Sequence, residues 1–125
     1  MKTIVLILLM LSCYVLPAAA ANPKLPTDDI TGVYRCDGGS YSGTVVIQKY
    51  GETYQLVWTI GPQTHMGVAI REGELLSSCW APSNGPPGIV VYRIGPDRKL
   101  SGRYAGLGGD GKVFTETLTF VSPLE

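Results

Sequence analysis

Apolar and polar residues alternate with a period of two through most of the chain after residue 30, and helix-period patterns are missing there. The clearest example is segment 53–60, where Tyr54, Leu56 and Trp58 fall on one face and Thr53 and Gln55 on the other. Successive side chains of a β-strand point to opposite faces, so this pattern indicates strands that each bury one face. The sequence therefore predicts an all-β domain.

Turn-forming residues separate the alternating segments at intervals of about 8–12 residues. Gly51-Glu52 and Gly95-Pro96-Asp97, for example, are suited to tight turns. The segments that we expect to form strands are 31–37, 44–50, 53–60, 65–71, 75–80, 88–94, 99–105 and 113–120. About eight short strands joined in order favour a small antiparallel up-and-down barrel, because closure leaves no unpaired edge. Side chains would fill most of its interior, leaving at most a small cavity.

Glycine also occurs inside the expected strands, at Gly32, Gly67 and Gly102. A glycine within a strand usually permits a sharp bend or the close approach of another group. A small and strongly curved barrel needs such positions.

The first 21 residues follow the order of a secretory signal peptide. A basic start at Lys2 precedes an apolar run over 4–11, which is much shorter than the ~20 residues of a membrane span. Small residues follow, and cleavage after Ala20 or Ala21 fits equally well. We expect a signal peptide at 1–21, a flexible lead-in at 22–29 and a barrel domain at 30–125, with a secreted or periplasmic location. The alternative is a buried N-terminal helix.

Cys13 lies inside this leader, and a lipoprotein signal also ends at a cysteine. The preceding Met10-Leu11-Ser12 departs from the usual lipobox, and apolar residues continue past the cysteine. We expect Cys13 to be removed with the signal, and lipid attachment is the alternative.

Charge argues against two classes of partner. Removing Lys2 with the signal leaves nine basic and ten acidic residues, a net charge of −1. Nucleic acids and anionic membranes are bound by concentrated positive surfaces. We therefore expect neither as a partner, and no membrane span after cleavage.

Two cysteines remain after cleavage, Cys36 and Cys79. Outside the cytoplasm such a pair usually oxidises, and closing a loop of about 40 residues would stabilise the domain by about 3–4 kcal/mol. We expect this disulfide, with two buried free thiols as the alternative. CxxC spacings typical of redox or zinc sites are absent from the sequence.

Two motifs that could carry chemistry have simpler interpretations. Residues 106–112 satisfy GxGxxG, but a strand pattern follows where a phosphate-binding loop needs a helix N-terminus. His65 is the only histidine, without a second imidazole or a serine elbow motif nearby. We expect a glycine-rich hairpin turn, no catalytic or metal site, no cofactor and no enzymatic activity.

Glu116 is the most informative charged residue. It shares a face of segment 113–120 with Phe114 and Leu118, so alternation points it inward, where a carboxylate needs a charge partner or hydrogen bonds. Candidate partners are Arg35, Arg93, Arg103, Tyr34 and Tyr104. We expect a structural network that closes the barrel, and the alternative is a polar anchor inside a ligand pocket.

Six aromatic residues are candidates for the interior of the barrel, namely Tyr34, Tyr54, Trp58, Trp80, Tyr92 and Tyr104. We expect them to form the core of so small a barrel, and lining a ligand pocket is the alternative.

Residues 30–120 resemble a family of small exported bacterial proteins with a calycin-like barrel, often labelled fibronectin-binding proteins. The matching segments are 32–36, 41–45, 54–60, 67–70, 88–92, 100–104 and 115–119. Tyr104 stands where the family pattern tends toward Trp, and Cys79 is not part of that pattern.

The resemblance implies the barrel fold, and together with the residues it favours a non-enzymatic binding module. Its partner would be an extracellular protein bound at the loops or a small apolar ligand bound at the barrel mouth. The alternative is a structural envelope or secreted protein without a specific ligand.

Overall fold

The structure is a computed structural model that describes residues 29–125. The predicted signal peptide (1–21) and residues 22–28 of the predicted lead-in lie outside the described residues. Within 29–125 there is no helix, and so none that is long and apolar enough to cross a membrane. The strands are β1 (Gly32–Asp37), β2 (Ser42–Tyr50), β3 (Thr53–Ile60), β4 (Gln63–Glu72), β5 (Leu75–Pro82), β6 (Gly88–Ile94), β7 (Lys99–Gly106) and β8 (Phe114–Ser122).

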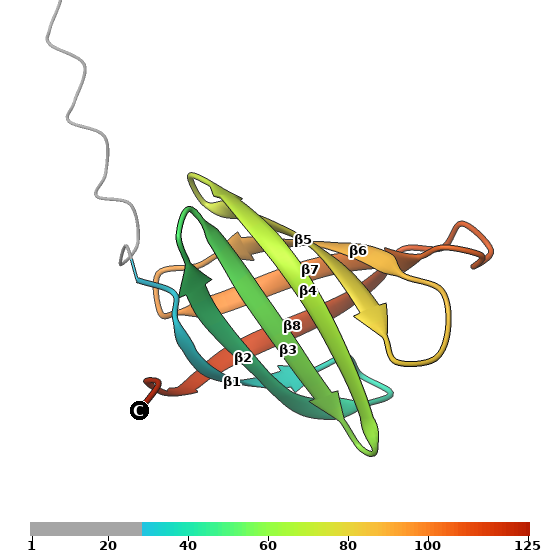
Figure 1. Cartoon of the computed structure of the whole chain (residues 1–125), viewed down its shortest axis with the longest axis horizontal. Helices are drawn as coiled ribbons and strands as arrows, with labels where there is room; N and C mark the ends of the chain where they lie inside the picture. The colour runs from blue at the N-terminus through green and yellow to red at the C-terminus, as the bar shows by residue number, and fades with distance from the viewer. Residues whose placement is uncertain (1–28) are drawn as a thin grey trace, which may run out of the picture.

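The eight strands form one closed barrel in which each strand pairs antiparallel with the next (Figure 1). β1 and β8 pair antiparallel and close the ring, with a shift of register between Val33 and Tyr34. The predicted all-β, up-and-down barrel is confirmed. Two expected strands, 53–60 and 88–94, match β3 and β6 residue for residue, and the others differ by up to two residues at an end.

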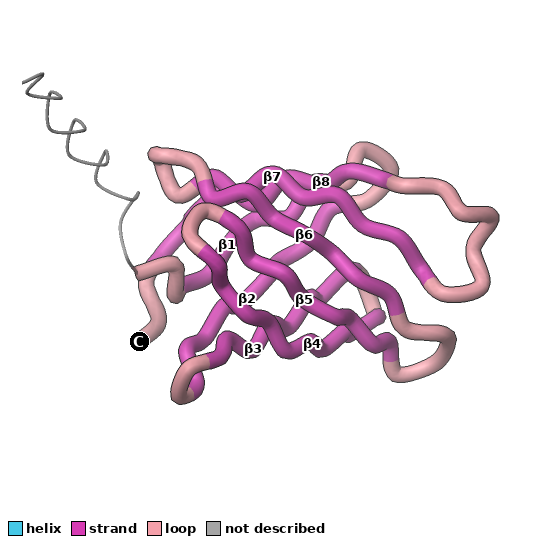
Figure 2. The backbone as a smooth tube through the Cα atoms, turned by 90° about the horizontal axis from the view of Figure 1, so that it is seen from above, coloured by secondary structure: helices cyan, strands magenta, loops and turns pink. Residues whose placement is uncertain are grey.

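The two ends of the barrel differ in their connections (Figure 2). At one end, which we call the open end, the loops that follow β1, β3, β5 and β7 include the two longest, at 83–87 and 107–113. The expected glycine-rich turn lies in the second of these loops and leads into β8, not into a helix. At the closed end the turns are shorter, and the chain enters β1 and leaves β8.

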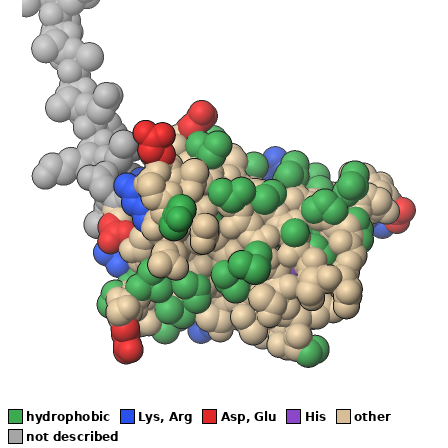
Figure 3. Space-filling view, in the orientation of Figure 1, with side chains coloured by type: hydrophobic (Ala, Val, Ile, Leu, Met, Phe, Trp, Pro, Cys, Tyr) green, Lys and Arg blue, Asp and Glu red, His purple; other side chains and the backbone are tan. Residues whose placement is uncertain are grey.

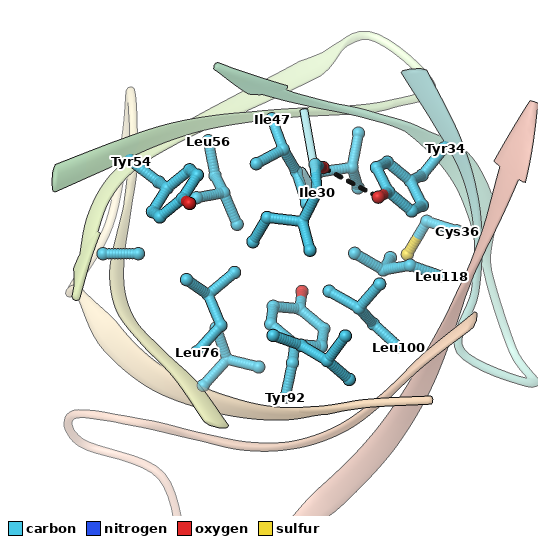
Figure 4. Close-up of a cluster of buried hydrophobic side chains, with 14 of the residues drawn as sticks. Ile30, Tyr34, Cys36, Ile47, Tyr54, Leu56, Leu76, Tyr92, Leu100 and Leu118 are labelled. Carbon is cyan, nitrogen blue, oxygen red and sulfur yellow. Dashed lines mark hydrogen bonds between the residues drawn. The ribbon is translucent and has the colours of Figure 1, made fainter. Parts of the chain in front are cut away.

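Ile30 plugs the closed end. It lies just before β1, its side chain is 1 % exposed, and its carbonyl oxygen accepts a 2.7 Å hydrogen bond from the hydroxyl of Tyr34. Figure 4 shows Ile30 in the centre of the barrel, surrounded by inward side chains that include Leu56, Leu100 and Leu118. The apolar core therefore fills this half of the barrel, and any cavity must lie toward the open end.

β4 presents its large apolar side chains to the outside. Met66, Val68 and Ile70 are exposed, whereas the inward positions between them hold only Gly67 and Ala69. In the view of Figure 3, which looks onto this side of the barrel, hydrophobic side chains are spread over the strands and charged side chains lie mainly toward the ends. The small inward residues of β4 leave interior space for aromatic side chains from other strands.

The expected Cys36–Cys79 disulfide is wrong for this fold. Both residues are free cysteines: Cys36 is buried inside the barrel, and Cys79 is exposed on its outer surface. Three strands also lie between β1 and β5 in either direction around the ring. The alternative of two buried thiols holds only for Cys36.

Candidate ligand pocket

A cavity of about 300 Å³ lies at the open end of the barrel. This volume is at the lower limit of the range typical of small-molecule sites, about 300–1,000 Å³. The lining residues are Tyr41, Trp58, Ile60, Gln63, His65, Trp80, Val90, Tyr104 and Glu116. They come from six strands and from the loop between β1 and β2, so the pocket depends on the closed barrel.

Trp80 forms one wall of the pocket because two glycines face it. Gly88 and Gly106 pair across β6 and β7, and Gly88 is also the partner of Trp80 across β5 and β6. A Cβ atom at Gly88 would lie 2.2 Å from Cζ2 of Trp80, so the indole occupies the space of the missing side chain. The indole and the ring of His65 meet edge to face at a centroid distance of 5.7 Å.

Tyr92 reaches the base of the pocket through a similar arrangement. It pairs with Gly102 across β6 and β7, and a Cβ atom at Gly102 would lie 2.7 Å from Cε1 of the tyrosine ring. Figure 4 shows this ring pointing from β6 into the interior. Gly102 thus provides the close approach expected from its position inside a strand.

Glu116 collects four hydrogen-bond donors at the base of the pocket. Its Oε1 accepts from the hydroxyl of Tyr92 and, at 3.3 Å, from the indole nitrogen of Trp58. Its Oε2 accepts from the hydroxyl of Tyr41 at 2.7 Å and from the thiol of Cys36 at 3.2 Å. These contacts join β8 to β1, β3, β6 and the β1–β2 loop. Glu116 is only 7 % exposed, and the network compensates for much of the hydration that its carboxyl group loses.

The inward position of Glu116 agrees with the prediction, but its donors are not the predicted partners. Arg35, Arg93 and Arg103 are exposed on the outside of the barrel, each one position away from an inward residue. The hydroxyl of Tyr34 donates instead to the carbonyl of Ile30 at the closed end. All four donors to Glu116 are therefore uncharged groups.

Burial and the carboxylate raise the pKa values of these donors. For the hydroxyl of Tyr92 and the thiol of Cys36, burial is the largest cause and the charge of Glu116 adds to it. Burial also raises the pKa of Tyr41, and its side-chain hydrogen bonds to Tyr104 and Glu116 are further causes. Each donor keeps its proton at neutral pH, and Cys36 is an unreactive thiol and not a nucleophile.

The predicted aromatic residues divide into two groups. Tyr34, Tyr54 and Tyr92 belong to the core, and Trp80 and Tyr104 line the pocket. Trp58 belongs to both, because it is buried in the core cluster and also lines the pocket. Sequence reasoning on the expected inward faces missed several lining residues, namely Tyr41, Ile60, Gln63, His65 and Val90.

Tyr41 lies outside the strands, so alternation could not assign its direction. A signal for it does exist in the preceding Gly38. A Cβ atom at that glycine would lie 2.1 Å from the tyrosine ring, so the ring needs a glycine there.

The pocket is rich in aromatic rings and contains one carboxyl group. None of its lining residues is lysine or arginine. Within residues 29–125 no group of three or more His, Cys, Asp or Glu side chains is placed to hold a metal ion. The arrangement suits a ligand that packs on aromatic rings and meets a polar group at one end.

No protein-family model matches the sequence, and neither does any curated protein. A solved structure described as a REP1-NXSQ fatty acid transporter is similar in fold, with a TM-score of 0.53 and 11 % sequence identity. The match covers 78 % of this chain and 98 % of that one. At this identity the likeness shows a shared barrel fold and nothing about a shared ligand.

Proposed function

We propose that this protein is an exported, non-enzymatic binding module that holds a small, largely apolar molecule in the open-end pocket. One observation carries the proposal: the cavity of about 300 Å³ has aromatic walls and a single buried carboxyl group at its base. Binding sites for small molecules combine these features, whereas a barrel with a purely structural role has no need of such a cavity.

Three further points support the proposal. The similar fold of a protein described as a fatty acid transporter is an example of such a barrel with a small-molecule cargo. The leader over 1–21 fits export, and the resemblance to small exported calycin-like proteins points the same way. The thiol of Cys36, which donates to Glu116 at the base of the pocket, is held protonated by burial and by Glu116, which argues against covalent catalysis.

Tryptophan fluorescence offers a direct test, because the chain contains two tryptophans and both line the pocket. Titration of the purified protein with 1-octanol should change the emission of Trp58 and Trp80 and should reach saturation. The absence of a saturable change with neutral, cationic and anionic eight-carbon probes would overturn the proposal.

Neighbouring residues of β6 supply a blocking variant and its control. Val90 is buried and lines the pocket, so Val90→Phe should fill the cavity and remove most of the octanol binding. Ile89 is exposed on the outer surface, so Ile89→Phe should bind like the unaltered protein. The melting temperature of each variant shows whether the barrel is intact. An intact Val90→Phe variant with unchanged affinity would place binding elsewhere.

Export has a separate test. The N-terminus of the protein recovered outside the cytoplasm should be Ala21 or Asn22. Recovery only in the cytoplasm with Met1 retained would contradict the proposed export.

A further inference from the structure

We infer that the open-end pocket selects a small organic cation, an amine or a quaternary ammonium with a short apolar body, over a fatty acid. This inference rests on the proposed function and specifies the chemical class of its ligand. It follows from three features: the charge of the pocket, the aromatic walls and the positions of the basic side chains.

The carboxyl group in the pocket has no cationic partner. Glu116 lines the cavity, and its four donors are two tyrosine hydroxyls, an indole and a thiol, none of which carries positive charge. Neutral donors stabilise a carboxylate by hydrogen bonds and do not cancel its charge as a lysine or arginine would. Arg93 forms an ion pair with Glu74 on the outer surface, away from the pocket. A cation in the cavity would therefore meet an attractive charge at short range and with little screening.

Aromatic rings make up much of the remaining wall. The rings of Trp58, Trp80, Tyr41 and Tyr104 all line the cavity, and the last two meet edge to face at a centroid distance of 6.4 Å. The faces of aromatic rings attract cations, most strongly in tryptophan and where water is excluded. The same rings also provide apolar surface for the body of the ligand. An aromatic wall beside a carboxylate thus favours the charged and the apolar parts of an organic amine together.

A fatty acid fits the same site poorly. Its carboxylate would be held best by a permanent positive charge, yet no lysine or arginine lines the cavity. The basic side chain in the lining is His65, whose ring packs against Trp80. Arg35 and Arg103, on strands next to Glu116, point to the outside of the barrel. The four donors at the base already bond to Glu116, and two carboxylates in one site repel each other. The shared fold with a fatty acid transporter therefore does not extend to the ligand headgroup.

Three probes of equal chain length test the inference: octylammonium, 1-octanol and octanoate, each titrated into the purified protein by calorimetry. Octylammonium should bind at least about tenfold more tightly than octanoate, with octanol between them. Equal or tighter binding of octanoate would overturn the inference and leave the proposed function standing. Binding of none of the three would overturn the proposed function itself.

Two variants identify the source of the selectivity. Trp80→Leu keeps an apolar wall but removes the indole, so octylammonium should lose at least about threefold in affinity while octanol changes less than about twofold. Tyr50→Leu is the matched control, because Tyr50 is an exposed aromatic residue near the closed end and should leave both affinities unchanged. Equal losses for octylammonium and octanol in Trp80→Leu would contradict a role of the aromatic wall in selecting charge.

The charge itself is tested with Glu116→Gln. In a folded variant, the preference for octylammonium over octanoate should fall to less than about threefold. A preference that persists in full would overturn the role of Glu116. The three-probe comparison on the unaltered protein decides the inference even if this variant does not fold.

Discussion

The hydroxyl of Tyr41 donates a 2.7 Å hydrogen bond to Oε2 of Glu116, although the two residues are 75 positions apart. Tyr41 belongs to the β1–β2 loop at the open end, and Glu116 lies on the inward face of β8. This bond fastens the loop to the strand that closes the barrel. It also places the tyrosine ring at the wall of the pocket, so one contact serves both the stability of the fold and the shape of the site.

Tyr41→Phe should lower the free energy of unfolding by about 1–2 kcal/mol. The variant leaves Oε2 of Glu116 with one donor fewer, and hydrogen bonds to charged acceptors are stronger than average. Urea denaturation measures the change. Tyr50→Phe serves as a control, because Tyr50 is 69 % exposed and its loss should change the stability by less than about 0.5 kcal/mol. Equal stabilities of the two variants would contradict a structural role of the Tyr41 bond.

Glu116→Gln should lower the melting temperature by at least about 4 °C. A side-chain amide offers one acceptor oxygen where the carboxylate offers two, and its NH₂ group would face the donors Tyr41 and Cys36. In a domain of about 100 residues a loss of 1 kcal/mol corresponds to about 4–8 °C. Thermal unfolding followed by circular dichroism measures the shift. An unchanged melting temperature would disprove the structural network.

Alkaline pH should destabilise the barrel. Burial raises the pKa of Tyr34 from 10.0 to about 12, and it raises the pKa of Cys36 above its ordinary 9.0. Above pH 9.0 the unfolded chain therefore releases protons that the folded chain retains, so the free energy of unfolding falls as the pH rises. Below pH 9.0 both groups are protonated in both states, and their contribution is constant.

Urea denaturation from below pH 9.0 to about pH 12 measures this dependence. Tyr34→Phe should show a shallower fall between pH 10.0 and about 12, because one raised pKa is removed. The comparison uses slopes, so the lost hydrogen bond to Ile30 does not affect it. Identical slopes would contradict the assignment to Tyr34.

The barrel was predictable from the sequence because alternation and turn residues agree along the whole domain. The inward faces of β3 and β6 follow directly from the period of two. β4 shows the limit of this reasoning. Its alternation is regular, but the large apolar residues Met66 and Ile70 are exposed and the small Ala69 is buried. The interior of the barrel is filled by side chains from all strands together. The pattern within one strand therefore does not show which other strand fills the space beside its small inward residues.

The pocket was only partly predictable for the same reason. Glu116 was correctly placed inside, but its donors come from three other strands and a loop, and no local pattern pairs them. The predicted arginines have a charge that suits Glu116, but they lie on the outward face of their strands. Arg35, for example, lies between the inward Tyr34 and Cys36 and therefore points outward. The alternation of side chains along a strand thus excludes candidate partners of a buried group more reliably than opposite charge identifies them. The register that joins Gly88 to Trp80 is likewise a property of the closed sheet.

Cys79 should react with a thiol reagent in the folded protein, and Cys36 should react only after unfolding. Cys79 is exposed on β5, whereas Cys36 is fully buried and its raised pKa suppresses the reactive thiolate. Alkylation with iodoacetamide, followed by peptide mass spectrometry, measures the two sites separately and compares them with and without urea. Protection of Cys79 that is relieved only by a reductant would instead indicate a disulfide.

Gly88→Ala should damage both the pocket and the fold, whereas Gly106→Ala should be tolerated. The two glycines face each other across β6 and β7, and neither adopts a left-handed backbone conformation. A Cβ atom at Gly88 would lie 2.2 Å from Cζ2 of Trp80 and 2.5 Å from the carbonyl oxygen of Ala105, so the indole must move. At Gly106 the nearest atom of Trp80 would be 3.4 Å away, an ordinary contact.

Gly88→Ala should therefore lower the free energy of unfolding by about 1–3 kcal/mol, as overpacking does, and Gly106→Ala by less than about 1 kcal/mol. The displaced indole should also shift the tryptophan emission and weaken the binding of octylammonium in Gly88→Ala alone. Urea denaturation, emission spectra and calorimetry measure the three effects on the same pair of proteins. If both variants bind and unfold alike, Trp80 does not depend on the space that Gly88 leaves, and the wall of the pocket is built in another way.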